Sequence, residues 1–64
     1  QEERCRHASR AVYLYGEAAR TSQTMVEVLA QGNDRELYDS AVETRDAARD
    51  VAQQVQDMDN QQCG

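Results

Sequence analysis

The residues of this chain with the clearest chemistry are two cysteines, Cys5 and Cys63, which lie near opposite ends of the 64 residues. The strongest break signal, Gly32-Asn33-Asp34, lies midway between them. If the chain folds back there, Cys5 comes to lie opposite Cys63, where the two thiols can form a disulfide. Closing so long a loop stabilises a folded chain by about 4 kcal/mol in the chain-entropy model. We therefore interpret the pair as a structural disulfide, with a bond between two chains as the alternative.

The cysteines also bear on where the protein works. Disulfides persist in oxidising compartments, and two cysteines in a short chain predict a secreted, cell-surface or periplasmic protein. No apolar run approaches the roughly 18 residues that a membrane-spanning helix needs. We therefore expect no membrane insertion.

Other side chains offer little chemistry. There is one histidine, His7, and no predicted nucleophile–base pair, so we expect no enzyme. His7 and Met58 come near each other in the fold-back as a conceivable haem ligand pair. However, C-x-x-C-H is absent, and a two-helix hairpin lacks a pocket for haem unless it dimerises. We expect neither a cofactor nor a metal. The net charge of −5 disfavours nucleic acid, because an acidic chain repels phosphates.

The two halves of the chain share one spacing. Small and apolar residues recur at alternating intervals of three and four, as in coiled coils. This predicts helices over about residues 2–31 and 34–60, joined by a turn over 32–34, within one domain of residues 1–64. The expected fold is all-α: an antiparallel, coiled-coil-like two-helix hairpin closed by the terminal disulfide. The predicted seams are Cys5, Ala8, Val12, Tyr15, Ala19, Ser22, Val26 and Leu29, then Leu37, Ala41, Thr44, Ala48, Val51, Val55 and Met58.

The residue types at 32–34 agree with a turn between the two predicted helices. Gly32 is expected to adopt the left-handed conformation that ends many helices. Asn33 is expected to cap the second helix, with Glu36 completing a capping-box-like pattern.

Pairing across the hairpin supports the fold-back. Apolar positions meet, with Val12 opposite Val55 and Ala8 opposite Met58. The pattern also predicts three ion pairs between the helices: Arg10 with Asp57, Arg20 with Asp46, and Glu17 with Arg49.

The first helix is apolar over more than one seam, an arc wider than one partner helix can cover. Either these residues stay partly exposed, or they pack against another protein or a second copy, which would complete a four-helix bundle. The candidate interaction surface consists of Ala11, Leu14, Ala18, Met25 and Val28, with Tyr13 on the neighbouring polar face.

The second helix carries an acidic face at helical spacing. A solvated face is the ordinary interpretation, and a docking surface for a basic partner is the alternative. Its residues are Glu36, Asp39, Glu43, Asp46, Asp50 and Asp57.

These patterns predict a non-enzymatic hairpin that acts by protein–protein interaction. Two alternatives stay open. One is a secreted effector peptide, a toxin or a signalling factor, that acts on a receptor. The other is a coiled-coil segment of a larger extracellular protein.

Overall fold

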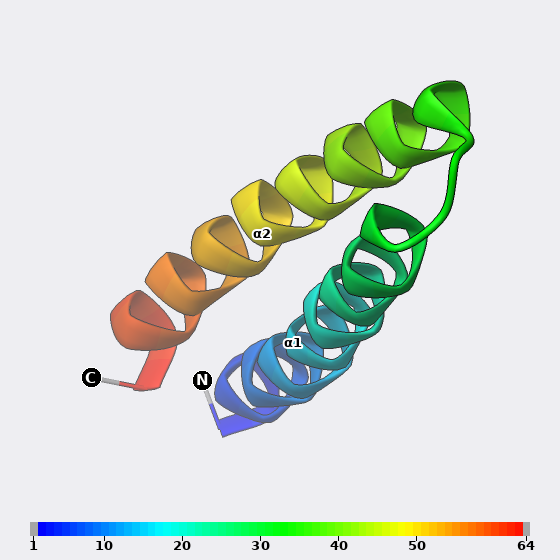
Figure 1. The fold of residues 1–64 in the computed structure, drawn as a ribbon. Coiled ribbons are helices and arrows are strands. Elements are labelled where there is room, and N and C mark those ends of the chain that lie inside the picture. Colours follow the sequence, from blue (N-terminus) through cyan, green and yellow to red (C-terminus); the bar gives the residue numbers. More distant parts are fainter. Residues whose placement is uncertain (1, 64) are drawn as a thin grey trace.

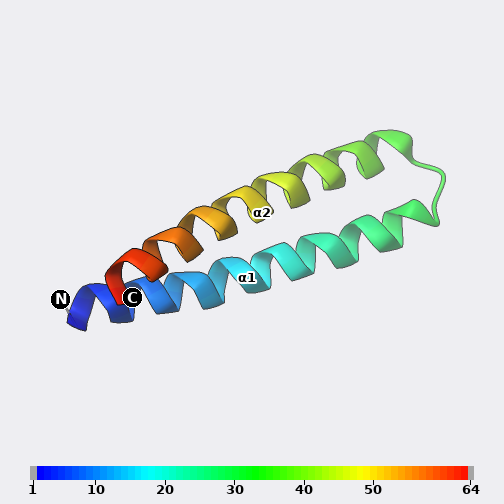
Figure 2. The same cartoon turned by 90° about the vertical axis from the view of Figure 1, so that its left-hand side faces the viewer.

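A computed structural model describes residues 2–63, which form two long antiparallel helices (Figure 1). Helix α1 spans Glu2–Ala30 and helix α2 spans Arg35–Cys63. The second view shows the two helices side by side along their length, with the start of α1 next to the end of α2 (Figure 2). The predicted all-α hairpin is confirmed, and its open end is closed by a Cys5–Cys63 disulfide with a Cα–Cα distance of 5.0 Å.

The hairpin is a thin rod of 49 × 13 × 12 Å. Its radius of gyration is 14.5 Å, whereas a compact domain of this length would have a value of about 11 Å. Among residues 2–63, the buried apolar residues are Ala8, Val26 and Val55. Two helices alone therefore leave much of their apolar surface in contact with solvent.

The end of α1 is tighter than the sequence predicted. Gln31 N donates to Val28 O at 3.2 Å, and Gly32 N donates to Leu29 O at 3.1 Å. In both hydrogen bonds the donor lies three residues after the acceptor, as in a 3₁₀ turn, and the acceptors are carbonyls that the end of the α-helix leaves unpaired. No described glycine has a positive φ. The prediction that Gly32 adopts the left-handed conformation was therefore wrong.

The cap of α2 is Asp34 rather than Asn33. Asp34 Oδ1 accepts a 3.1 Å hydrogen bond from Leu37 N, three residues on, as an N-cap side chain does. Asp34 O also accepts the first helical bond, from Tyr38 N. Because α2 begins at Arg35, one residue later than predicted, the capping position falls on Asp34.

The two helices keep one register from the open end toward the turn. Cys5 is bonded to Cys63. Ser9, four residues on, bonds Asp59, four residues back. Gln23, fourteen residues further along α1, bonds Arg45, fourteen residues back along α2. Each step along α1 is therefore matched by one step along α2.

The seam of α2 lies one residue away from its predicted position at several points. Leu37, Thr44 and Met58 are exposed, whereas Tyr38, Arg45 and Asp59 are half-buried. The disulfide explains this rotation. Cys63 must face Cys5, and it lies about 40° around the helix from Asp59 but about 140° from Met58. Since α2 is helical through Cys63, no unwinding is needed to form the bond.

None of the three predicted ion pairs between helices forms among the described residues. Glu17 instead pairs with Arg20 at 2.9 Å, and Asp46 with Arg45 at 2.9 Å. Glu17, Arg20 and Asp46 are all exposed, where a partner on the same helix is within easier reach.

Candidate interaction surface

The predicted surface on α1 is exposed along most of its length. Leu14, Met25 and Val28 are 52%, 51% and 59% exposed. Ala18 is exposed as well, and Ala11 is half-buried at the edge toward α2. Packing against α2 therefore does not cover this stripe.

Helix α2 extends the same surface. Leu37 and Met58 are 54% and 53% exposed, and Val51 is half-buried. They share one side of α2, since the intervals between them are multiples of seven residues. Met58 lines a shallow groove together with Ala11 of α1, so both apolar stripes lie on one side of the hairpin. We call this set the apolar face: Ala11, Leu14, Ala18, Met25 and Val28 of α1, and Leu37, Val51 and Met58 of α2.

The contribution of α2 was missed from the sequence, because Leu37, Val51 and Met58 were assigned to the seam. One signal could have revealed it. Met58 and Cys63 are five residues apart and cannot both face α1. The disulfide thus required Met58 to turn outward.

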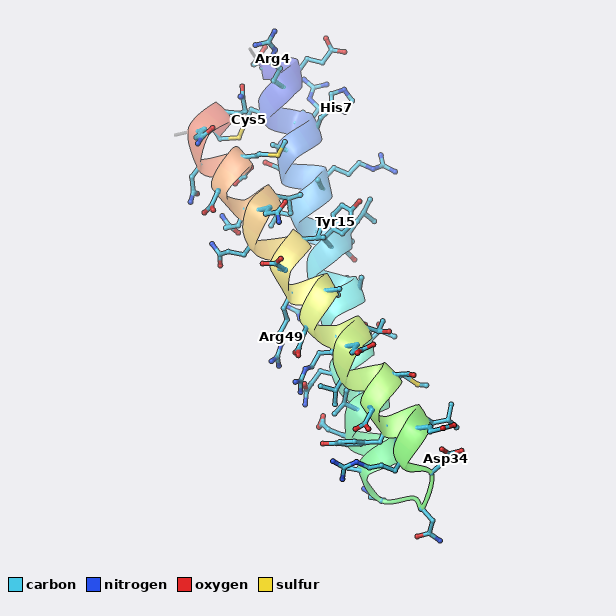
Figure 3. The ribbon with its side chains drawn as sticks, turned by 90° about the horizontal axis from the view of Figure 1, so that it is seen from above. Arg4, Cys5, His7, Tyr15, Asp34 and Arg49 are labelled. Atoms are coloured by element: carbon cyan, nitrogen blue, oxygen red, sulfur yellow. A yellow bond between two sulfur atoms is a disulfide. The ribbon has the colours of Figure 1, made fainter. Side chains whose placement is uncertain are left out.

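Tyr13 lies apart from the apolar face. Its side chain is 68% exposed, and it projects about 100° around α1 from Leu14. Tyr15, predicted for the seam, is 43% exposed instead. In Figure 3, Tyr15 and His7 project on one side of the hairpin and Arg49 projects on the other.

The side that bears Arg49 is polar and bonded internally. Gln23 Oε1 accepts hydrogen bonds from Arg45 Nη1 at 3.2 Å and from Arg49 Nη2 at 3.0 Å. The Arg45 side chain is only 20% exposed, and it also donates two bonds to Asp46 Oδ1. This Gln23 cluster joins the helices in the half of the hairpin nearer the turn. It was not predicted, because Arg45 was not assigned to the seam.

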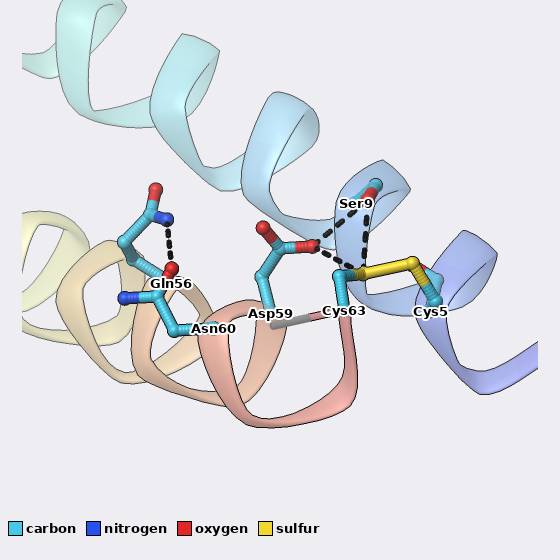
Figure 4. Close-up of a disulfide and its surroundings, with 6 residues drawn as sticks. All are labelled: Cys5, Ser9, Gln56, Asp59, Asn60 and Cys63. Carbon is cyan, nitrogen blue, oxygen red and sulfur yellow. Dashed lines mark hydrogen bonds between the residues drawn. A yellow bond between two sulfur atoms is a disulfide. The ribbon is translucent and has the colours of Figure 1, made fainter. Parts of the chain in front are cut away.

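Cys63 lies fourteen residues from Arg49 on α2, so the disulfide is on the same polar side. Figure 4 shows the disulfide beside Ser9 and Asp59. Ser9 Oγ donates to Asp59 Oδ1 at 2.8 Å. The same carboxylate oxygen is 3.3 Å from Cys63 Sγ. This is a van der Waals contact and not a hydrogen bond, because a sulfur in a disulfide has no hydrogen to donate. Ser9 and Asp59 therefore tie the helices one turn away from the covalent bond.

The acidic face of α2 is exposed at all six predicted residues. Asp39 pairs with Arg35 at 3.2 Å, and Asp57 accepts a hydrogen bond from Gln53 at 3.1 Å. Glu36, Glu43, Asp50 and Asp57 recur every seven residues and form an outer stripe. This stripe separates the apolar face from the polar side on the outside of α2.

Within residues 2–63, no group of three or more histidine, cysteine or acidic side chains is placed to hold a metal ion. His7 lies at the rim of the groove that contains Met58, and its Nε2 is 3.8 Å from Glu3. Neither described helix has an apolar stretch that would cross a bilayer.

The chain matches no protein-family model, no curated protein and no solved structure. Its function must therefore be inferred from the apolar face and the polar side that lies opposite.

Proposed function

We propose that this hairpin is a non-enzymatic binding module that acts by protein–protein contact through its apolar face. One observation carries the proposal: large apolar side chains on both helices are exposed on a single side, while the opposite side is occupied by internal hydrogen bonds. Exposed apolar residues scattered singly are ordinary, but a contiguous patch marks an interaction site.

The energy available at this face is substantial. Completely burying a Leu or Met side chain contributes about 1.5–3 kcal/mol. Leu14, Met25, Leu37 and Met58 are each about half exposed. Covering them together would supply several kcal/mol in favour of a complex, before the cost of association is subtracted.

The disulfide supports an oxidising location for this activity. We extend the proposal to a secreted, cell-surface or periplasmic protein. An effector peptide that binds a receptor would use the apolar face in the same way. A segment of a larger extracellular protein would use it against helices of its own chain.

Site-specific photo-crosslinking tests the proposal. Benzoylphenylalanine is placed at Leu14 in one variant and at Tyr13 in a matched control, and each is produced in the native cells and irradiated. We expect a protein adduct from position 14 and little from position 13. Equal adducts from both positions, or none from position 14, would overturn the apolar face as the contact surface.

A further inference from the structure

The exposed stripe of α1 is a second heptad seam. Its residues lie at alternating intervals of four and three, the spacing at which one helix packs along another. The surface that fits such a stripe is another long helix rather than a loop or a sheet edge. The seam consists of His7, Ala11, Leu14, Ala18, Thr21, Met25 and Val28.

This second seam carries no Asp, Glu or Arg. A charged partner would therefore lose hydration there without gaining an opposite charge. The acidic stripe of α2 would also repel another copy of α2. A second copy can bring its own uncharged α1 seam to the contact while keeping its acidic stripe outside.

The seam is self-complementary when two copies of α1 run antiparallel. With the two-fold axis between Ala18 and Thr21, these two small residues meet at the centre. Leu14 then meets Met25 of the second copy, and Ala11 meets Val28. Small residues at the crossing let the two helices approach closely, and the larger side chains pack on either side.

Charge favours the antiparallel over the parallel arrangement. A parallel pair would place the two turns together, where the acidic residues Glu27, Asp34, Glu36 and Asp39 outnumber Arg35. The antiparallel pair instead places each turn beside the start of α1, where Arg4, Arg6 and Arg10 outnumber Glu2 and Glu3. Arg35, at the turn, is already paired with Asp39 at 3.2 Å.

The surface area is also sufficient. The hairpin exposes 5088 Å², whereas a compact monomer of 7.2 kDa would expose about 4,100 Å². The excess of about 1,000 Å² arises from the elongated shape of the whole molecule. It exceeds the roughly 800 Å² that each partner buries in a standard interface, so a dimer of ordinary size would bring the exposure of each copy to that of a compact protein.

We infer that the occupant of the apolar face is a second copy of this chain, bound through antiparallel packing of α1 on α1 to form a four-helix bundle. This inference rests on the proposed function and names its partner. The two-fold arrangement also brings Met58 of one copy near Leu37 of the other, so the exposed residues of α2 flank the central contact.

Introducing opposite charges at positions 14 and 25 tests two points: whether the partner is a second copy of the chain, and whether the two α1 helices run antiparallel. Sedimentation velocity measures the wild type, Leu14→Glu, Met25→Arg and the double variant, with Tyr13→Glu as the matched control. We expect a wild-type dimer, an unchanged control, and single variants whose dimer dissociates about a hundredfold more readily, because each buries an unpaired charge. The double variant should regain the dimer, since the carboxylate introduced at position 14 would then meet the guanidinium introduced at position 25 of the other copy.

Each result decides a separate point. A wild type that stays monomeric at millimolar concentration overturns the second copy as occupant. An adduct with a different protein from position 14 would still support the proposed function in that case. If the single variants dissociate and the double variant does not recover, the antiparallel arrangement is wrong. Circular dichroism verifies that each variant is helical, and Ala18→Arg with Thr21→Glu is the replacement pair if either single variant loses its helices.

Discussion

The hydroxyl of Ser9 on α1 donates a 2.8 Å hydrogen bond to the carboxylate of Asp59 on α2. Ser9 lies one turn beyond Cys5, and Asp59 lies one turn before Cys63, so the hydrogen bond and the disulfide occupy neighbouring turns. Together they fix the rotation of each helix about its own axis at the open end. This rotation determines that Met58 faces the same side as Ala11.

Removing the disulfide should weaken the fold severely. Cys5→Ser deletes a bond across 58 residues of sequence separation, and we expect the free energy of unfolding to fall by about 4 kcal/mol. Thermal unfolding followed by circular dichroism measures this loss of stability. The wild type in the presence of a reductant should have the same melting midpoint as Cys5→Ser. Ser9→Ala, which removes only the neighbouring hydrogen bond, should cost about 1 kcal/mol. Equal melting midpoints for the oxidised and reduced wild type would contradict the role of the Cys5–Cys63 disulfide in stabilising the fold.

Gly16→Ala should stabilise the hairpin. Gly16 lies inside α1, and a Cβ placed there would meet no atom within 4 Å. Alanine restricts the unfolded chain and favours the helix, so we expect a gain of about 1 kcal/mol in the free energy of unfolding. Ala47→Gly, at an exposed position inside α2, is the matched reverse change and should lose a similar amount. A lower melting midpoint for Gly16→Ala would show that the position has a packing role.

Replacing Asp34 should weaken the start of α2. Asp34→Ala removes the acceptor for Leu37 N, and we expect a loss of about 1 kcal/mol. Asn33→Ala is the control and should change stability by a few tenths of a kcal/mol at most, although Asn33 was the cap predicted from the sequence. Urea unfolding at fixed protein concentration compares the two. The assignment fails if Asn33→Ala proves the more damaging change.

The Gln23 cluster should respond to charge. Gln23→Glu offers a carboxylate to Arg45 and Arg49, and we expect a gain of about 0.5–1 kcal/mol at low salt that shrinks as salt is added, since the pairs are partly exposed. Gln23→Leu keeps the bulk of the side chain but leaves Arg45 without this acceptor, and should cost about 1–2 kcal/mol. Melting curves at low and high sodium chloride measure both. A salt-independent effect of Gln23→Glu would contradict an electrostatic cause.

The architecture could be predicted from the sequence because its signals are local or nearly so. Heptad spacing gave both helices, Gly32-Asn33-Asp34 gave the turn, and the placement of Cys5 and Cys63 gave the disulfide. These signals do not fix the rotation of α2 about its axis. A rotation by one residue exchanges Thr44 for Arg45 in the seam, and either choice keeps a heptad spacing.

The candidate surface was predicted on α1 and missed on α2 for this reason. The stripe through Leu14, Met25 and Val28 cannot face α2 at any reasonable rotation, so the sequence alone identifies it. Leu37 and Met58 can face either way, and the disulfide decides between the two. The predicted ion pairs failed because exposed charges on a helix have several partners at similar distance.

The exposed turn and the disulfide together determine what a protease could do to this molecule. A single cut between α1 and α2, within the exposed residues 31–34, would leave both helices joined through sulfur. The product would be heavier than the intact chain by one water, and reduction would separate it into two peptides of similar size. Cleavage would thus turn a one-chain hairpin into a two-chain helix pair with its register and apolar face intact.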